Sequence, residues 1–400
     1  MPQSQGTLFQ TARAERPQKN RAVTASLLAL SIVAVLATSW LPARADDAAP
    51  TPAAAPVPQI SDAVKQSATL DQDDIKEIQS KVALIVQSLA DGSHPNVQSA
   101  DRVWLIAALS DSNGNPAGSD YLQQYATIFN QQMLAMVSAP NANFRAKIQA
   151  GLAAGAVAAK TGSSAVAPLA VKLLQDPSAS VTLMGMKAAG GMVPGIFSGS
   201  SISPIESKLL DEIVGTVIRN PNPPLGGPIA EQAYLSLRQP VFAAINGSPS
   251  PLVDKVLVPL VLKLVEQRIA LYKAGKLPES PQADSTGVVI LLSPNVWQGL
   301  TRDQQHEALG AAADLISYSA QARDDQANDA ASTSLVQALK TDGQELRLFS
   351  DPGRGPAPDQ ALSDGVAHLG SLGLGSGAEA IDKASTEAVN AIKDYLSRNQ

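Results

Sequence analysis

The chain contains no cysteine among its 400 residues. This absence excludes disulfide bonds, thiolate metal sites, a cysteine nucleophile and the acylated cysteine of a bacterial lipoprotein. Aromatic residues are scarce too, at 4%, whereas 44% of the residues are apolar. A core must therefore be built from small and aliphatic side chains, which allow helices to approach one another closely. This composition predicts an all-α protein.

Residues of the kind that carry catalysis are few and scattered. Only three histidines occur, His94, His306 and His368, and they lie far apart in the sequence. His306-Glu307 begins like a zinc-protease helix, but Gly310 occupies the position of the second histidine. The Gly-x-Ser-x-Gly pattern of serine hydrolases is absent. We therefore expect a protein that is not an enzyme, the alternative being an active site assembled from residues distant in sequence.

Positive charge is in short supply beyond the N-terminal region. The whole chain has a net charge of −6, and residues 46–400 contain 25 basic against 35 acidic residues, a net charge of −10. Nucleic acids and anionic membrane surfaces repel such a chain. We expect no nucleic-acid partner, and a neutral or basic partner suits the charge better.

The N-terminal region has the pattern of an export signal. A basic stretch at 13–21 precedes an uncharged stretch at 22–43, and Ala43-Arg44-Ala45 has the small-x-small form that signal peptidase cleaves. Residues 1–45 therefore resemble a signal peptide, which predicts a periplasmic or extracellular protein. The alternative is an uncleaved membrane anchor formed by 22–43, which is long enough to cross a bilayer. No other integral membrane segment is expected.

The remainder divides by composition and apolar periodicity. Residues 46–59 form a Pro/Ala-rich linker, 60–348 a helical repeat domain, 349–357 a loop, and 358–400 C-terminal helices. The apolar spacing predicts helices at 71–90, 119–138, 142–159, 163–175, 179–192, 204–219, 226–238, 251–274, 301–320, 325–348, 358–369 and 378–397. A Gly/Ser-rich loop is predicted from Pro194 to Ser203. Pro259 predicts a kink or break, and 287–292 reads as either a strand or a buried helix.

A repeated pattern of helix, proline turn and helix runs from Met136 to Leu237. The turn prolines are Pro140, Pro177 and Pro221, at spacings of 37 and 44 residues. Apolar residues stand three and four positions before each proline and four positions after it. This pattern resembles the HEAT repeat, an antiparallel helix pair with a proline-marked turn. The resemblance implies an irregular α-solenoid of helical hairpins, followed by a packed C-terminal helical region.

The turn before the predicted helix 119–138 is rich in oxygen-bearing side chains. Asp111, Asn113, Asn115 and Ser119 match the alternating ligand positions of an EF-hand calcium loop. Pro116 replaces the turn glycine of that loop, and Leu122 replaces its bidentate glutamate. A calcium site at these four residues is therefore one hypothesis, and a polar turn between helices is the other. No other cofactor is expected.

These features favour noncatalytic binding of another protein or a cell-envelope component, because stacked helix pairs present an extended surface and need no reactive group. A helical carrier of a hydrophobic small molecule is a further alternative, with a cavity among the small residues of 179–200 and the predicted helix 251–274.

Cleavage of the signal peptide is directly testable. We expect the mature chain to begin at Asp46, because the small side chains of Ala43 and Ala45 suit the peptidase site. Intact-mass measurement of the exported native protein checks this. A mass that retains residues 1–45 contradicts it and supports the anchor.

Overall fold

The computed structural model describes residues 58–399, except 93, 223, 244–249, 251, 275–280 and 325–328. The predicted signal peptide 1–45, the anchor 22–43 and all but the last two residues of the linker 46–59 lie outside these described residues. Pro58–Gln400 form one compact unit, which contains the helices of both predicted regions, 60–348 and 358–400.

All regular secondary structure in the described residues is helical, which confirms the all-α prediction. The helices are α2 (Asp62–Lys65), α3 (Gln72–Asp91), α4 (Pro95–Ala107), α5 (Ser119–Ser138), α6 (Phe144–Thr161), α7 (Ala167–Leu174), α8 (Ala179–Ser198), α9 (Pro204–Arg219), α10 (Gly226–Ala243), α11 (Val258–Lys273), α12 (Pro281–Leu292), α13 (Pro294–Trp297), α14 (Arg302–Asp324), α15 (Asp329–Ser350), α16 (Gln360–Gly370) and α17 (Ala378–Arg398). The predicted loop at 349–357 lies at 351–359. None of these described helices is both long and apolar enough to cross a membrane.

Local sequence explains where several helices begin and end. Asp71 caps α3 by accepting hydrogen bonds from two backbone N–H groups, while the Asp74 side chain accepts from the N–H of Asp71. Ser203 and Glu206 form the same reciprocal pair at the start of α9. Such caps satisfy N–H groups that have no partner within the helix. Gly92 ends α3 in the left-handed conformation, with φ of 65°, which glycine adopts without steric cost.

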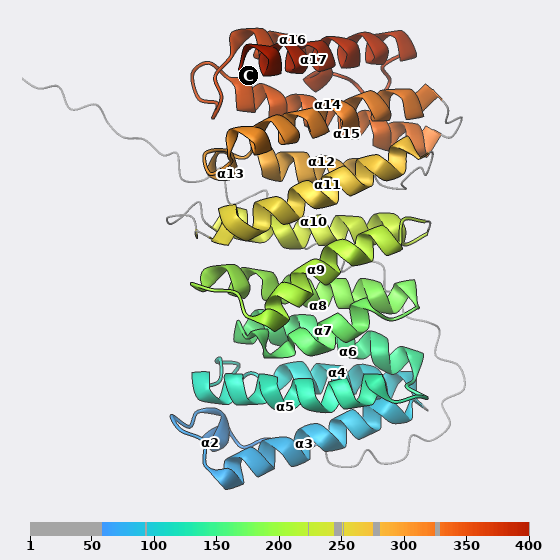
Figure 1. Cartoon of the computed structure of the whole chain (residues 1–400). Helices are drawn as coiled ribbons and strands as arrows, with labels where there is room; N and C mark the ends of the chain where they lie inside the picture. The colour runs from blue at the N-terminus through green and yellow to red at the C-terminus, as the bar shows by residue number, and fades with distance from the viewer. Residues whose placement is uncertain are drawn as a thin grey trace, which may run out of the picture. The chain divides into compact units, whose positions relative to one another are not determined.

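The helices pack in two rows, and each helix contacts the next members of its own row. One row contains α4, α6, α8, α10, α12, α15 and α16, and the other contains α3, α5, α7, α9, α11, α14 and α17. Figure 1 shows the described chain running from α3 at one end to α16 and α17 at the other. Contacts between the rows join sequence neighbours, such as α5 with α6 and α7 with α8. The core is therefore continuous along the compact unit.

The three predicted proline turns each connect two helices that pack together. Pro140 follows α5, Pro177 follows α7 and Pro221 follows α9, and each of these helices contacts its successor. The apolar residues before the prolines are mostly buried. Phe144, which the repeat pattern predicts to be packed, is instead 52% exposed, because it is the first residue of α6.

The predicted loop from Pro194 to Ser203 is wrong over its first half. Helix α8 continues through Pro194 to Ser198. A proline removes one backbone hydrogen bond from a helix, but Val193, Ile196 and Phe197 are buried here. Burial of three apolar side chains outweighs one missing bond, since each contributes about 1.5–3 kcal/mol.

Two further ambiguities are resolved in the C-terminal half. Residues 287–292 belong to helix α12, so the strand alternative is wrong. Their β-branched side chains are buried against neighbouring helices, which removes the advantage of a sheet. Before Pro259, residues 253–257 form a π-helical turn that leads into α11. The wider turn lies directly before Pro259, which has no N–H to donate to the preceding turn of the helix.

Glycine allows α6 and α8 to approach at backbone distance. A Cβ atom on Gly191 would lie 2.5 Å from the carbonyl oxygen of Gly155, and one on Gly151 would lie 2.6 Å from Cβ of Met184. Both distances are shorter than any ordinary van der Waals contact. The small residues that dominate the composition are therefore required at this helix pair.

A methyl group at this contact tests its importance. Gly191→Ala is expected to lower the free energy of unfolding by about 1–3 kcal/mol, because the added Cβ forces α6 and α8 apart. Gly310→Ala is the matched control, since a Cβ at this helical position meets no atom within 4 Å. The control is expected to gain about 0.5–1 kcal/mol from helix propensity. Urea unfolding followed by circular dichroism measures both, and equal effects of the two substitutions contradict the close packing.

Candidate functional site

The most polar part of the core lies where α10, α11 and α12 meet. Arg268 donates two hydrogen bonds to Asp284, from Nε to Oδ1 at 2.9 Å and from Nη2 to Oδ2 at 3.0 Å. The hydroxyl of Tyr234 donates to Oδ1 at 3.1 Å, and that of Tyr272 donates to Oδ2. All four side chains are buried. We call these four residues the Arg268–Asp284 cluster.

Opposing electrostatic effects act on this buried ion pair. Burial raises the pKa of Asp284, but the Arg268 guanidinium and the Tyr234 hydroxyl oppose that shift. The carboxylate of Asp284 raises the pKa of Arg268 against the effect of burial. A buried ion pair of this kind contributes little net stability, yet loss of either partner leaves an uncompensated charge.

Neighbouring side chains pack closely around the Arg268–Asp284 cluster. Tyr272 stacks on Tyr318 with ring centroids 4.2 Å apart. A Cβ on Gly287 would lie 2.7 Å from the Tyr234 ring, so the glycine makes room for the tyrosine that reaches Asp284. Because the ionic groups are buried on all sides, the cluster holds α10, α11 and α12 in register.

Asp342 of α15 is a second buried acid close to this cluster. Its side chain is 0% exposed. Burial raises the pKa of Asp342 to about 8; the nearby Ser285 hydroxyl opposes the shift and the negative charge of Asp284 adds to it. Asp342 is therefore neutral at pH 7, which removes most of the cost of burying it.

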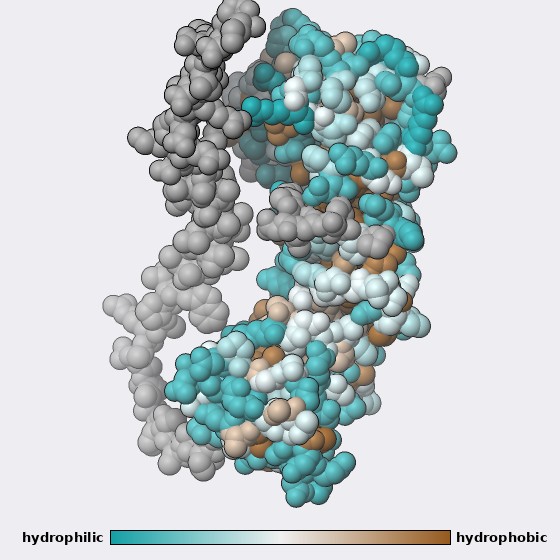
Figure 2. Space-filling model, turned by 90° about the vertical axis from the view of Figure 1, so that its left-hand side faces the viewer, coloured by the Kyte–Doolittle hydropathy of each residue, from teal (hydrophilic) through white to brown (hydrophobic). Residues whose placement is uncertain are grey.

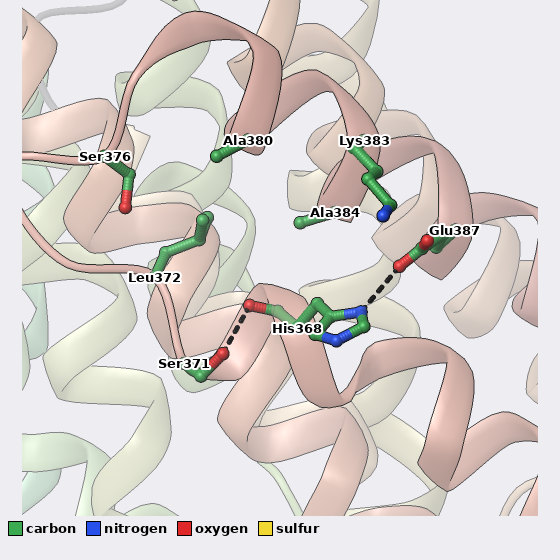
Figure 3. A pocket seen from close by; sticks show the side chains of 8 residues that line it. All are labelled: His368, Ser371, Leu372, Ser376, Ala380, Lys383, Ala384 and Glu387. Atoms are coloured by element: carbon green, nitrogen blue, oxygen red, sulfur yellow. Dashed lines mark hydrogen bonds and ion pairs between the residues drawn. The ribbon is translucent and has the colours of Figure 1, made fainter.

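A surface pocket lies between α16 and α17 (Figure 3). It measures about 280 Å³ and is lined by His368, Ser371, Leu372, Ser376, Ala380, Lys383, Ala384 and Glu387. Nδ1 of His368 lies 2.8 Å from Oε2 of Glu387. Ser371 Oγ donates to the carbonyl of His368, and Ser376 Oγ accepts from the N–H of Gly373. Both hydroxyls thus stabilise the connection between α16 and α17. The polar groups of the pocket that remain are an exposed His–Glu pair and Lys383.

The loop predicted to bind calcium is organised by its own hydrogen bonds. Oδ1 of Asp111 accepts from the N–H groups of Asn113 and Asn115, and Oδ2 accepts from the side-chain amide of Asn115. These bonds lower the pKa of Asp111, the Asn115 side chain having the largest effect. Ser119 lies farther along, as the first residue of α5. The hydrogen bonds explain a polar turn, and calcium binding stays a prediction.

The three histidines are not brought together. His94 precedes α4, His306 Nε2 lies 3.0 Å from the carbonyl oxygen of Asn399, and His368 pairs with Glu387. Within the described ranges, no three or more His, Cys, Asp or Glu side chains form a group that could hold a metal ion.

The sequence prediction missed the Arg268–Asp284 cluster, although α11 carried a signal. Val261, Leu264 and Val265 of α11 are buried, and the next positions of the same stripe are Arg268 and Tyr272. A charged residue in a buried stripe must find a partner. Its partner lies on another helix, Asp284 on α12, and helical spacing within α11 cannot identify it.

Comparisons with known proteins add little to this geometry. No protein-family model matches the chain, and no curated protein matches it. Among solved structures, an engineered protein from a structural genomics consortium is similar with a TM-score of 0.33 and 13% sequence identity, over 78% of this chain and 96% of that one.

Removal of the charge of Asp284 tests the buried pair. Asp284→Asn is expected to lower the free energy of unfolding by about 3–5 kcal/mol, because Arg268 stays buried without a counter-charge. Asp314→Asn is the control, since its 2.7 Å pair with Lys273 is exposed, and it is expected to cost less than about 1 kcal/mol. Urea unfolding distinguishes them; equal losses contradict the assignment.

Asp342 predicts a pH dependence of stability. The folded protein keeps this proton up to about pH 8, whereas the unfolded chain releases it near the ordinary value of 3.8. The stabilisation is complete below 3.8 and is lost as the pH rises to about 8. Asp342→Asn removes the titration, so its melting temperature relative to wild type is expected to rise between about pH 5 and about pH 8. A constant difference across that range refutes the raised pKa.

Proposed function

We propose that this chain is an exported, noncatalytic α-solenoid of the HEAT-like kind, which binds another protein or a cell-envelope component across its helix surface. One observation carries the proposal. Each row of helices continues through contacts between successive members, from α3 to α17 in one row and from α4 to α16 in the other. The outer face of such a row offers many helix surfaces in sequence to a single partner.

The distribution of side chains supports binding by surface. The Arg268–Asp284 ion pair is buried, and its carboxylate also accepts hydrogen bonds from two tyrosines, so the pair is not presented to a partner. On the face shown in Figure 2, polar residues predominate and apolar ones come to the surface in separate patches. Large apolar side chains that are exposed occur on several helices: Leu84, Val97, Val103, Phe144, Leu235 and Leu348. Recognition by a mixed polar and apolar surface is typical of partners that associate and separate.

Photocrosslinking in intact cells tests the proposal. A photoreactive residue is placed in turn at Leu84, Leu235 and Leu348, which lie on α3, α10 and α15 and are at least 41% exposed. A solenoid scaffold is expected to crosslink to the same envelope protein from positions on more than one helix. Leu374, in the connection between α16 and α17, is the control for nonspecific capture.

The outcomes separate the candidate functions. Crosslinks to one recurrent protein that are stronger than those from Leu374 support binding across the helix surface. Crosslinks no stronger than the control contradict it, and a hydrophobic molecule in the native mass spectrum of the same protein then indicates a carrier.

A further inference from the structure

A groove lies on the surface between α11 and α14, and its lining residues are regularly spaced along both helices. It measures about 310 Å³ and is lined by Glu266, Ile269, Ala270 and Lys273 of α11 and by Glu307, Gly310, Ala311 and Asp314 of α14. Both sets follow the spacing i, i+3, i+4 and i+7, which places four residues of each helix along one face. The two helices therefore supply matching walls.

The floor of the groove is apolar and incompletely filled. Ile269 and Ala311 are buried, each 6% exposed, and Ala270 beside them is exposed. A Cβ on Gly310 would meet no atom within 4 Å. The glycine is therefore not needed for close packing, and its effect is to leave space above the floor that the stem of a long side chain can occupy.

Charge differs between the ends of the groove. At one end Lys273 and Asp314 form an ion pair of 2.7 Å. At the other end Glu266 and Glu307 are both exposed, and the structure shows no ion pair to either of them from the described residues. One turn earlier, Lys263 of α11 and Asp303 of α14 carry opposite charges. Two carboxylates are left facing an apolar floor.

We propose that this groove receives a lysine or arginine side chain from a basic segment of a protein partner. The aliphatic stem lies on Ala270, Gly310 and Ala311, and the cationic head meets Glu266 and Glu307. Long basic side chains bind in this way because their stems are apolar while their heads stay hydrated. The net charge of −10 over residues 46–400 favours such a partner over a second copy of this chain. This inference rests on the proposed binding function and names the partner's chemistry.

A short fluorescent peptide of alternating lysine and alanine is the probe, and anisotropy with the purified full chain measures its affinity. A second peptide replaces each lysine with diaminobutyric acid, which is also cationic at about pH 6.5 but has a shorter stem. If attraction to an acidic surface alone caused binding, the two peptides would bind with equal affinity. The groove is expected to bind the lysine peptide at least several-fold more tightly, because only the long stem covers the floor.

Variants separate the groove from the rest of the acidic surface. The double variant Glu266→Gln/Glu307→Gln and the single variant Gly310→Leu, which fills the space without changing charge, are each expected to weaken binding about tenfold. The control Glu379→Gln/Asp382→Asn removes two exposed charges from α17 and is expected to change affinity less than about twofold. Circular dichroism confirms that each variant keeps its helices.

Equal binding of the two peptides, or a control variant as damaging as the groove variants, overturns the assignment. Together with the crosslinking experiment, the peptide experiment distinguishes failure of the groove proposal from failure of the proposed function. A recurrent partner in cells without peptide binding at the groove refutes the groove alone. Peptide binding at the groove in a protein that crosslinks to no partner refutes the binding function in cells and leaves the groove's chemistry established.

Discussion

The close contact between α6 and α8 is the constraint on which the rest of the packing depends. With few aromatic side chains and no disulfides, this protein gains stability by bringing helix backbones near one another. Gly191 permits that approach at Gly155, where any side chain would collide with a carbonyl oxygen. Helix α8 also contacts α10, which contacts α12 in turn. A displacement at α6 would therefore pass to every later member of that row.

The Arg268–Asp284 cluster links the two rows, because α10 and α12 belong to one row and α11 to the other. It connects α10, α11 and α12 through one carboxylate that accepts hydrogen bonds from an arginine and two tyrosines. Apolar packing tolerates small sliding movements of one helix past another, whereas a bidentate ion pair tolerates almost none. The cluster and the neutral Asp342 thus favour one register of these helices over others of similar apolar burial.

The polar groups of this scaffold differ between its core and its surface. The deeply buried polar groups hold helices together, and the exposed His368–Glu387 pair lies beside Ser371, whose hydroxyl donates to the His368 carbonyl. The groove between α11 and α14 differs, because its floor is left open by Gly310 and its acidic end lacks a partner among the described side chains. In the binding function that we propose, such a groove would receive a basic segment of the partner.

The amino-acid sequence by itself determined the helical class and most helix boundaries. Helix α5 and helix α9 begin and end where the apolar spacing predicts. The proline turns at Pro140, Pro177 and Pro221 were also predictable, because proline acts on the residues next to it. These are local effects, decided within a few residues of the chain.

Only the tertiary structure decided what depends on distant neighbours. Pro194 stays inside α8 because Ile196 and Phe197 are buried by other helices, and burial at that site cannot be read from the local sequence. The same holds for Arg268 and Asp284, which are 16 residues apart and belong to different helices. Glu266 and Glu307 likewise line one groove only because α11 packs on α14. Charge pairs and grooves between helices arise from packing, which acts across the chain, whereas helices arise from forces that act along it.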